Sequence, residues 1–201
     1  AFANCDQLVT VYIGSGVSSI GDAVFHNCYH LEEISVHIGN PYYTSVGGVL
    51  YDDAFTTLIK CPPALAGDVS IPDSVTSLRD GCFDDCRYLE NLVIGSGVAE
   101  IDDYMFESAD DLRTVTFSSG SQLQTIGVMA FSECGKLESF TGPAGLRGIG
   151  YGAFQDCESL IAIDLPSGLE SIGMGAFAGC TSLANLTIPA SVEEVGNYAF
   201  A

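Results

Sequence analysis

A motif anchored on phenylalanine recurs from one end of this 201-residue chain to the other. A complete copy runs from Ala176 to Pro189 and reads A-F-x-x-C-x-x-L-x-x-[LIV]-x-[LIV]-P. The anchoring phenylalanines are Phe2, Phe25, Phe83, Phe106, Phe131, Phe154, Phe177 and Phe200. Five of the seven intervals between them are 23 residues long, and the other two are 25 and 58. A fixed period of this size predicts a solenoid, because each coil needs its neighbours to bury its apolar face.

The apolar positions within the motif predict the course of one coil. Between Ala176 and Leu183 they have the spacing of one face of a short helix. Between Asn185 and Ile188 polar and apolar residues alternate, as in a strand with one buried face, and Pro189 ends that strand. We therefore expect a right-handed coil of short parallel strands joined by short helical or 3-10 turns.

The long interval between Phe25 and Phe83 equals two periods and 12 further residues. It ends on Val69–Pro72, which matches the strand before Pro189, so it contains one additional coil. The surplus falls within residues 40–60, where two β-rich runs flank a short polar turn. This pattern predicts a β-hairpin insert within a single array that spans residues 1–201.

The motif, together with an I-G pair before the A-F pair as at Ile172-Gly173, resembles the BspA-type leucine-rich repeat. The resemblance covers essentially the whole chain, and the interruption at Tyr43–Tyr51 also looks like one common in that family. It implies a leucine-rich-repeat solenoid from a cell-surface protein of a host-associated bacterium or a protist. It also implies adhesion to host matrix proteins or to other cells.

Some coils depart from the motif. Ala109 replaces the cysteine after Phe106, and the alanine before the phenylalanine is replaced by Val24, Cys82 and Met105. Each substitute is apolar, so we expect the fold to tolerate them.

The charge of the chain excludes two classes of partner. Asp and Glu number 26 against 6 Lys and Arg, which gives a formal net charge of −20. Such a polyanion repels nucleic acids and anionic lipid. No run of 18 apolar residues is present, so we expect no membrane insertion within this segment. The chain starts and stops within a repeat and has no polar caps, so we expect it to be an excerpt of a longer polypeptide.

Six of the eight cysteines follow the anchoring phenylalanine by three residues. They are Cys5, Cys28, Cys86, Cys134, Cys157 and Cys180. Equivalent positions of stacked coils form a column, and neighbouring thiols there point the same way, which is unsuited to disulfide geometry. We therefore interpret these cysteines as small buried apolar side chains.

The sequence predicts no catalytic residues, no metal site and no cofactor. It contains no G-x-S-x-G elbow and no Cys-His pair with an orienting group. Asp80 and Asp103 occupy equivalent positions in adjacent coils, and stacked carboxylates suit calcium, but no D-x-D-x-D-G loop accompanies them.

Two surfaces are candidates for binding. The first is the outward face of the strands, where small hydroxyl residues dominate; its candidate residues are Tyr12, Thr116, Thr141 and Thr187. The second is the insert, whose candidates are Tyr42, Tyr43, Tyr51, Asp52, Asp53 and Phe55. The alternatives are a strand face that is merely solvated and aromatic side chains that pack the hairpin onto its own coil.

These features favour a non-catalytic extracellular module for protein interaction or adhesion, displayed at the cell surface. Its partner would be a host matrix protein or a cell-surface protein, bound by a rigid sheet face and an aromatic hairpin. The alternative is a structural subunit that assembles with copies of itself into an extracellular filament or sheath.

Overall fold

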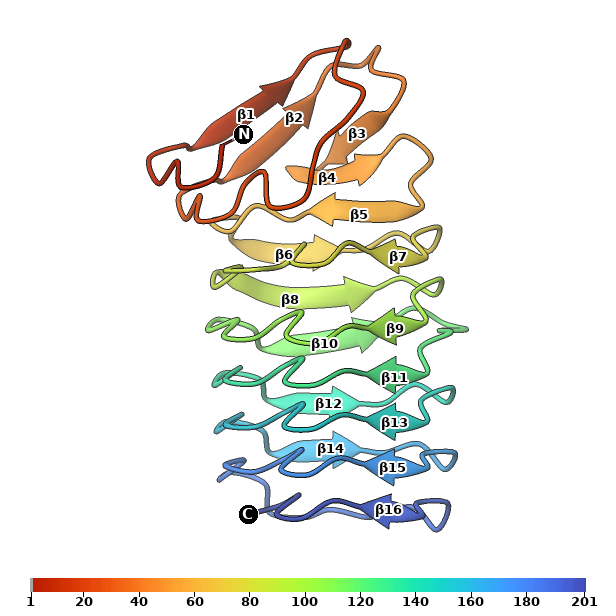
Figure 1. The fold of residues 1–201 in the computed structure, drawn as a ribbon. Helices are drawn as coiled ribbons and strands as arrows, with labels where there is room; N and C mark the ends of the chain where they lie inside the picture. Colours follow the sequence, from red (N-terminus) through yellow and green to blue (C-terminus); the bar gives the residue numbers. More distant parts are fainter. Residues whose placement is uncertain (1) are drawn as a thin grey trace.

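The computed structural model describes residues 2–201, which form a stack of flat coils (Figure 1). Ala1, the first residue of the predicted array, lies outside the described residues. The described residues contain sixteen short strands, β1 to β16, and no helix. The expected solenoid with one coil per repeat is therefore confirmed.

One sheet runs along a long side of the stack and takes one strand from each of five successive coils. Its strands are β6 (Gly67–Ser70), β8 (Leu89–Ile94), β10 (Thr114–Phe117), β12 (Ser139–Thr141) and β14 (Ala162–Asp164). All neighbouring pairs are parallel, and an isolated bridge from Ala162 to Asn185 continues the pairing into the last coil. We call this the strand face.

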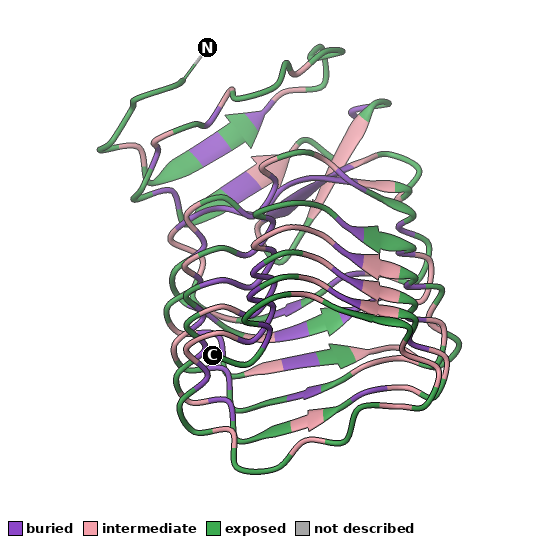
Figure 2. Cartoon of the chain, turned by 60° about the horizontal axis from the view of Figure 1, so that its bottom comes forward, coloured by how far each residue is buried: buried purple, intermediate pink, exposed green. Residues whose placement is uncertain are grey.

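A second parallel sheet lies on the return leg of the coils. Its strands are β9 (Glu100–Ile101), β11 (Thr125–Ile126), β13 (Gly148–Ile149), β15 (Ser171–Ile172) and β16 (Glu194–Val195). The two sheets enclose the apolar interior, and the exposed residues lie on the outside of the stack (Figure 2).

The turn between the two sheets is not helical because two left-handed residues interrupt it. In the coil of Phe131 they are Met129, with φ 53°, and Glu133, with φ 61°, two residues on either side of the phenylalanine. A left-handed residue breaks the run of helical hydrogen bonds. What remains are single turns, such as the hydrogen bond from the Cys134 amide to the Phe131 carbonyl at 3.3 Å.

The same two positions have positive φ in the other coils. The residues two before the phenylalanine are Ala23, Gly81, Tyr104, Met129, Gly152, Gly175 and Tyr198, and those two after it are Asn4, Asn27, Asp85, Ser108, Glu133, Asp156 and Gly179. This conformation directs alternate amides toward the next coil: the Met129 amide donates to the Tyr151 carbonyl at 2.8 Å and the Glu133 amide to Gln155 at 2.8 Å. The turns therefore form a third hydrogen-bonded ladder along the stack.

The anchoring phenylalanines form a column of stacked rings. Ring centroids lie 5.1 Å apart for Phe106 and Phe131, 5.2 Å for Phe131 and Phe154, and 5.3 Å for Phe154 and Phe177. The planes of these pairs differ by at most 9°. This spacing follows from the strand spacing of about 4.8 Å between coils.

The N-terminal part of the stack is organised differently. Strands β1 (Thr10–Ile13) and β2 (Glu33–Val36) pair in parallel, and Figure 1 shows that they run obliquely to the strands below them. A hairpin within the insert consists of β3 (Tyr43–Val46) and β4 (Val49–Asp52), which pair antiparallel. Its turn, Gly47-Gly48, has φ of 57° and 84°, as a two-residue hairpin requires.

A further strand follows in the insert. Strand β5 (Thr57–Lys60) pairs antiparallel with β4 and parallel with β7 (Ser77–Leu78). The insert therefore joins the parallel array through β5.

The insert separates two apolar clusters. Leu50 and Ile59 pack with the N-terminal cluster, which contains Phe25, whereas Tyr51 and Leu58 pack with the cluster of the remaining coils. Alternate residues of β4 and β5 thus face opposite clusters, as the geometry of a strand dictates. The insert lies between the two parts of the solenoid and takes the place of a regular turn there.

Candidate functional site

The strand face brings together some of the residues that the sequence assigns to it. Thr116 on β10 and Thr141 on β12 lie in one sheet, and both are exposed. Thr187 is also exposed and belongs to the next coil but one after Thr141. Tyr12 lies on β1 in a separate two-stranded sheet, where its side chain is 66% exposed and contacts His37 edge-on at 6.4 Å. Tyr12 therefore does not share a sheet with the threonines.

Polar side chains on the strand face are hydrogen-bonded from one coil to the next. The Asn91 amide group donates to the Asp68 carboxylate at 2.7 Å, and the Thr114 hydroxyl donates to the Asn91 side-chain oxygen at 2.7 Å. These bonds hold the side chains in one conformation before a partner arrives.

The strand face is hollowed over β10 and β12. A depression of about 520 Å³ is lined by Thr116, Thr141 and the loop that follows β10. That loop contains Gly120, with φ 78°, and belongs to the coil that is two residues longer than the others. Phe117 and Pro143 add apolar surface to its lining. Phe117 and Pro143 were not predicted from the sequence. The 25-residue interval between Phe106 and Phe131 is the sequence signal that indicates an irregular loop here.

The aromatic side chains of the insert do not form one surface. Tyr51 is 2% exposed, lies 5.4 Å from the Phe55 ring, and packs with it against the main cluster. Burial raises the pKa of Tyr51. The Tyr43 hydroxyl accepts a hydrogen bond from the Ile20 amide at 2.9 Å, while Tyr42 is 51% exposed. The proposed contact role of Tyr51 is therefore corrected, because β4 points this side chain into the core.

The two carboxylates of the insert have different environments. Asp52 accepts hydrogen bonds from the Thr56 amide at 2.7 Å, the Thr56 hydroxyl at 2.6 Å and the Thr57 amide at 2.9 Å. Burial opposes its ionisation, but these bonds from Thr56 and Thr57 outweigh burial and lower the pKa of Asp52. Asp52 thus closes the turn between β4 and β5, whereas Asp53 is exposed.

The cysteine column has a hydrogen-bonding function that the sequence did not reveal. The Cys134 thiol lies 3.2 Å from the Phe106 carbonyl oxygen of the preceding coil, and Cys157 and Cys180 repeat this contact at 3.2 and 3.1 Å. Burial raises the pKa of Cys134 to about 12. A thiol that stays protonated is a poor nucleophile and a poor metal ligand. Within residues 2–201 all eight cysteines are free, and Cys5 is exposed.

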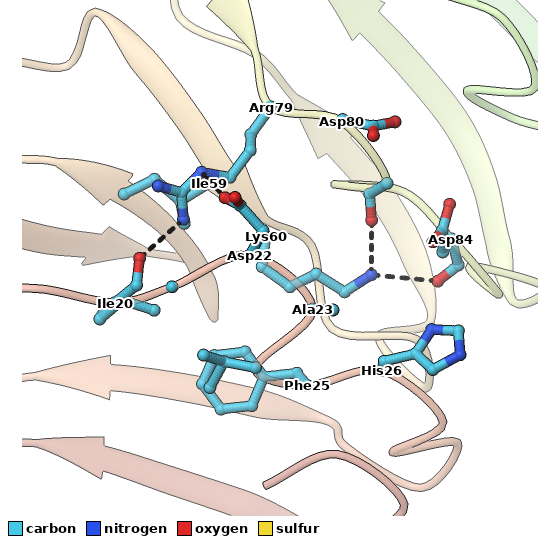
Figure 3. Close-up of a pocket in the computed structure, with 13 residues that line it drawn as sticks. Ile20, Asp22, Ala23, Phe25, His26, Ile59, Lys60, Arg79, Asp80 and Asp84 are labelled. Carbon is cyan, nitrogen blue, oxygen red and sulfur yellow. Dashed lines mark hydrogen bonds and ion pairs between the residues drawn. The ribbon is translucent and has the colours of Figure 1, made fainter. Parts of the chain in front are cut away.

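A second hollow lies at the break in the stack, between the turn of Phe25 and the turn of Phe83 (Figure 3). Its volume is about 170 Å³. Lys60 and Arg79 line it together with Asp22. Arg79 spans the break: its guanidinium donates to the Ile20 carbonyl at 3.1 Å and lies 3.5 Å from the Asp22 carboxylate.

Within residues 2–201 no group of three or more His, Cys, Asp or Glu side chains is placed to hold a metal ion.

The described residues contain no helix with the length and apolar character needed to cross a bilayer.

The fold and the strand face define a leucine-rich-repeat solenoid. The family model for the BspA-type leucine-rich repeat region matches residues 1–47, 64–149 and 111–201 in six copies. The chain therefore belongs to the BspA-type leucine-rich-repeat family, as its motif suggested. The gap in the match, residues 48–63, overlaps the insert.

Solved structures of bacterial proteins share this fold. A leucine-rich-repeat protein from Eubacterium ventriosum superposes with a TM-score of 0.74 at 24% identity, covering 95% of this chain and 57% of its own. A leucine-rich cell-surface protein from Faecalibacterium prausnitzii gives 0.75 at 27% identity, covering 94% and 48%. A leucine-rich-repeat protein from T. pallidum gives 0.60 at 34% identity, covering 66% and 61%. The chain thus spans about half the length of the first two, and it matches no curated protein.

Proposed function

We propose that this chain is a non-catalytic protein-interaction module of a cell-surface protein, and that it acts in adhesion. The hollow over β10 and β12 is the single observation that carries the proposal, because it gives the strand face a recess in which part of a partner can be enclosed. Proteins of the leucine-rich-repeat class generally bind other proteins, and the similar F. prausnitzii protein is described as a cell-surface protein.

The chemistry of the hollow suits a polypeptide partner. Its polar groups are mainly uncharged hydroxyls, including those of Thr116 and Thr141, although the chain as a whole carries a net charge of −20. Phe117 and Pro143 supply apolar contact beside them. Backbone amides and carbonyls of a partner segment can pair with the hydroxyls, while one small apolar side chain of the partner contacts Phe117.

Arginine substitution in the hollow tests this proposal. The wild-type chain and the double variant Thr116→Arg/Thr141→Arg are passed over a panel of purified host extracellular-matrix proteins, each immobilised for biolayer interferometry. We expect the wild type to bind at least one matrix protein and the variant to bind it at least tenfold more weakly, because two large side chains fill the hollow.

The matched control places two arginine side chains elsewhere on the surface. Gln124→Arg/Glu138→Arg changes two exposed residues outside the lining of the hollow and is expected to retain binding. The control also raises the net charge by more than the test variant does, so an electrostatic effect would appear in it more strongly. A wild-type chain that binds no matrix protein, or a Thr116/Thr141 variant that binds normally, contradicts the proposal.

A further inference from the structure

The break in the stack interrupts the hydrogen-bonded ladder of the turns. Above the break the ladder is regular: the Phe2 amide donates to the Val24 carbonyl at 3.0 Å, and the Asn4 amide donates to the His26 carbonyl at 2.8 Å. The turn of Phe25 should donate in the same way to a following turn. The insert supplies strands at this level, so the carbonyl groups of that following turn are absent.

The insert replaces the missing amide donors on the lower side of the break. The Lys60 ammonium donates to the Gly81 carbonyl at 2.9 Å and to the Asp84 carbonyl at 3.3 Å (Figure 3). The Cys61 amide donates to the Cys82 carbonyl at 2.8 Å. The carbonyls of Gly81, Cys82 and Asp84 in the turn of Phe83 are thus hydrogen-bonded.

The upper side of the break has no corresponding replacement. Among residues 2–201, no carbonyl or side chain accepts a hydrogen bond from the amides of Ala23, Phe25 or Asn27. Ala23 and Asn27 have φ of 52° and 57°, the conformation that directs these amides along the stack in the other coils. Ala23 and Phe25 line the hollow of about 170 Å³.

The next turn shows that unpaired amides alone do not make such a site. The Phe83 amide also finds no acceptor in the described chain, but Phe83 does not line the hollow. Open volume beside the donors occurs at the turn of Phe25.

A buried positive charge lies in the same hollow. Lys60 is 9% exposed, and no carboxylate of the described residues lies within 4.0 Å of its ammonium. Two carbonyls occupy two of its three N–H bonds, so one remains available. A buried charge without a counter-charge is costly, and an anionic oxygen beside it would offset that cost.

The acidic residues that line the hollow do not supply that counter-charge. Asp22 is already paired with Arg79, and its side chain is 89% exposed. Figure 3 shows the carboxylates of Asp80 and Asp84 directed away from the Lys60 ammonium. The groups available inside the hollow are therefore N–H donors, which select for acceptor oxygens and against cations.

We propose that the hollow at the break binds a carboxylate group. The carboxylate takes the place of the carbonyls of the missing following turn. Its two oxygens accept hydrogen bonds from the amides of Ala23 and Phe25 and from the remaining N–H of Lys60. The carboxylate belongs to a free small acid or to an Asp or Glu side chain of a bound protein, and the two sources share this chemistry.

Amide NMR shifts of the uniformly ¹⁵N-labelled chain test the proposal directly. Sodium acetate is titrated against sodium chloride at constant ionic strength, so only the anion changes. We expect saturable shifts of the Ala23 and Phe25 amides with acetate. The Phe131 amide, which donates to the Ala153 carbonyl at 2.7 Å, occupies the same position in an intact ladder and should not shift. Shifts that are absent, do not saturate or are equal in chloride overturn the proposal.

A second titration distinguishes the two sources. The capped peptide acetyl-Gly-Glu-Gly-amide is compared with acetate and with acetyl-Gly-Gln-Gly-amide. Tighter saturation by the glutamate peptide than by acetate assigns the site to a side chain of a partner, and the reverse order assigns it to a free acid. Equal effects of the glutamate and glutamine peptides, with no effect of acetate, overturn carboxylate recognition.

Lysine variants test the role of the ammonium. Lys60 and Lys136 are the two lysines of the chain, so Lys136→Met is a control with the same change of charge. We expect Lys60→Met to weaken acetate binding at least tenfold and Lys136→Met to leave it unchanged. Because Lys60 also holds the Gly81 carbonyl, Lys60→Arg is included: it keeps the charge and should retain binding within about threefold of wild type. Unaltered binding by Lys60→Met contradicts the proposed contact.

Discussion

The Phe131 amide donates a hydrogen bond of 2.7 Å to the Ala153 carbonyl, one coil further along the chain. The rings of Phe131 and Phe154 stack 5.2 Å apart beside this bond. The backbone hydrogen bonds and the stacked rings therefore connect the same adjacent coils, and both maintain the distance between those coils. The ladder depends on the left-handed residues on either side of the phenylalanine, which makes those positions the first test of the fold.

Glycine at a left-handed position should stabilise the solenoid. Glu133 has φ 61°, whereas the equivalent position of a later coil is already Gly179, with φ 76°. Burial raises the pKa of Glu107, and the nearby negative charge of Glu133 adds to this, so Glu133→Gly also relieves repulsion. We expect a gain of up to about 1 kcal/mol in the free energy of unfolding, measured with urea.

A β-branched residue at the same position provides the opposite test. Glu133→Val removes the same charge but disfavours positive φ, so we expect it to destabilise the fold by about 1–2 kcal/mol. Equal stability of the glycine and valine variants would show that the left-handed conformation is not what the position requires.

The sequence predicts the repeat and its core but not the ladder of the turns. The 23-residue period and the apolar positions depend on side-chain type, which can be read directly. Positive φ is signalled by glycine at Gly152 and Gly175, but Met129 and Tyr104 adopt it at equivalent positions and carry no such signal. Only the stacking of neighbouring coils imposes that conformation on them.

The candidate sites were less predictable than the fold, for a related reason. Tyrosine is a residue type typical of protein contacts, but the register of β4 with β5 directs the Tyr51 side chain into the core. Lysine is usually a surface residue. Here a turn is missing next to the turn of Phe83, and the Lys60 ammonium donates to carbonyls that this missing turn leaves unpaired. Both outcomes depend on which groups the adjacent coil places next to these residues. Where the repeat is interrupted, its period does not specify those groups.

The phenylalanine column should dominate stability. Phe154 is fully buried, and its ring stacks between those of Phe131 and Phe177. We expect Phe154→Ala to cost about 3–5 kcal/mol in guanidinium unfolding, because it leaves a cavity that two coils share. Phe200→Ala is the control: this side chain is 39% exposed and stacks on one neighbour, Phe177, so the cost should be clearly smaller.

The buried thiols should make stability fall at alkaline pH. The pKa of Cys134 is raised from 9.0 to about 12 by burial, so the unfolded chain ionises first as the pH rises. The contribution of the protonated thiol is complete below pH 9 and is lost between pH 9 and 12, by about 1.4 kcal/mol per pH unit. Urea unfolding of wild type and Cys134→Ala across this range measures the difference.

The Cys134→Ala variant removes the ionisable thiol, so its stability at alkaline pH is the reference for wild type. Ala109 occupies the equivalent position in another coil, so the substitution is compatible with the fold. Its stability should decline less steeply with pH than that of wild type. Parallel pH profiles for the two proteins would exclude a protonated, buried Cys134 as the cause.

Asp52 and Asp53 are adjacent carboxylates with different expected effects. The Asp52 carboxylate accepts three hydrogen bonds from Thr56 and Thr57, and Asp53 is exposed. We expect Asp52→Ala to lower the free energy of unfolding at pH 7 by about 1–3 kcal/mol, because it leaves the donors of the turn without their acceptor. Asp53→Ala should change it by less than about 0.5 kcal/mol.

The pH dependence of the Asp52 variant separates its charge from its shape. The pKa of Asp52 in the folded chain lies below its ordinary value of 3.8, so its contribution is complete above that pH and disappears as the pH falls through the lowered pKa. The stability difference between wild type and Asp52→Ala should therefore shrink below pH 4, while Asp53→Ala follows wild type throughout. A difference that persists undiminished at pH 2, measured by urea unfolding, would mean that the turn depends on the side chain's volume and not on its ionised oxygens.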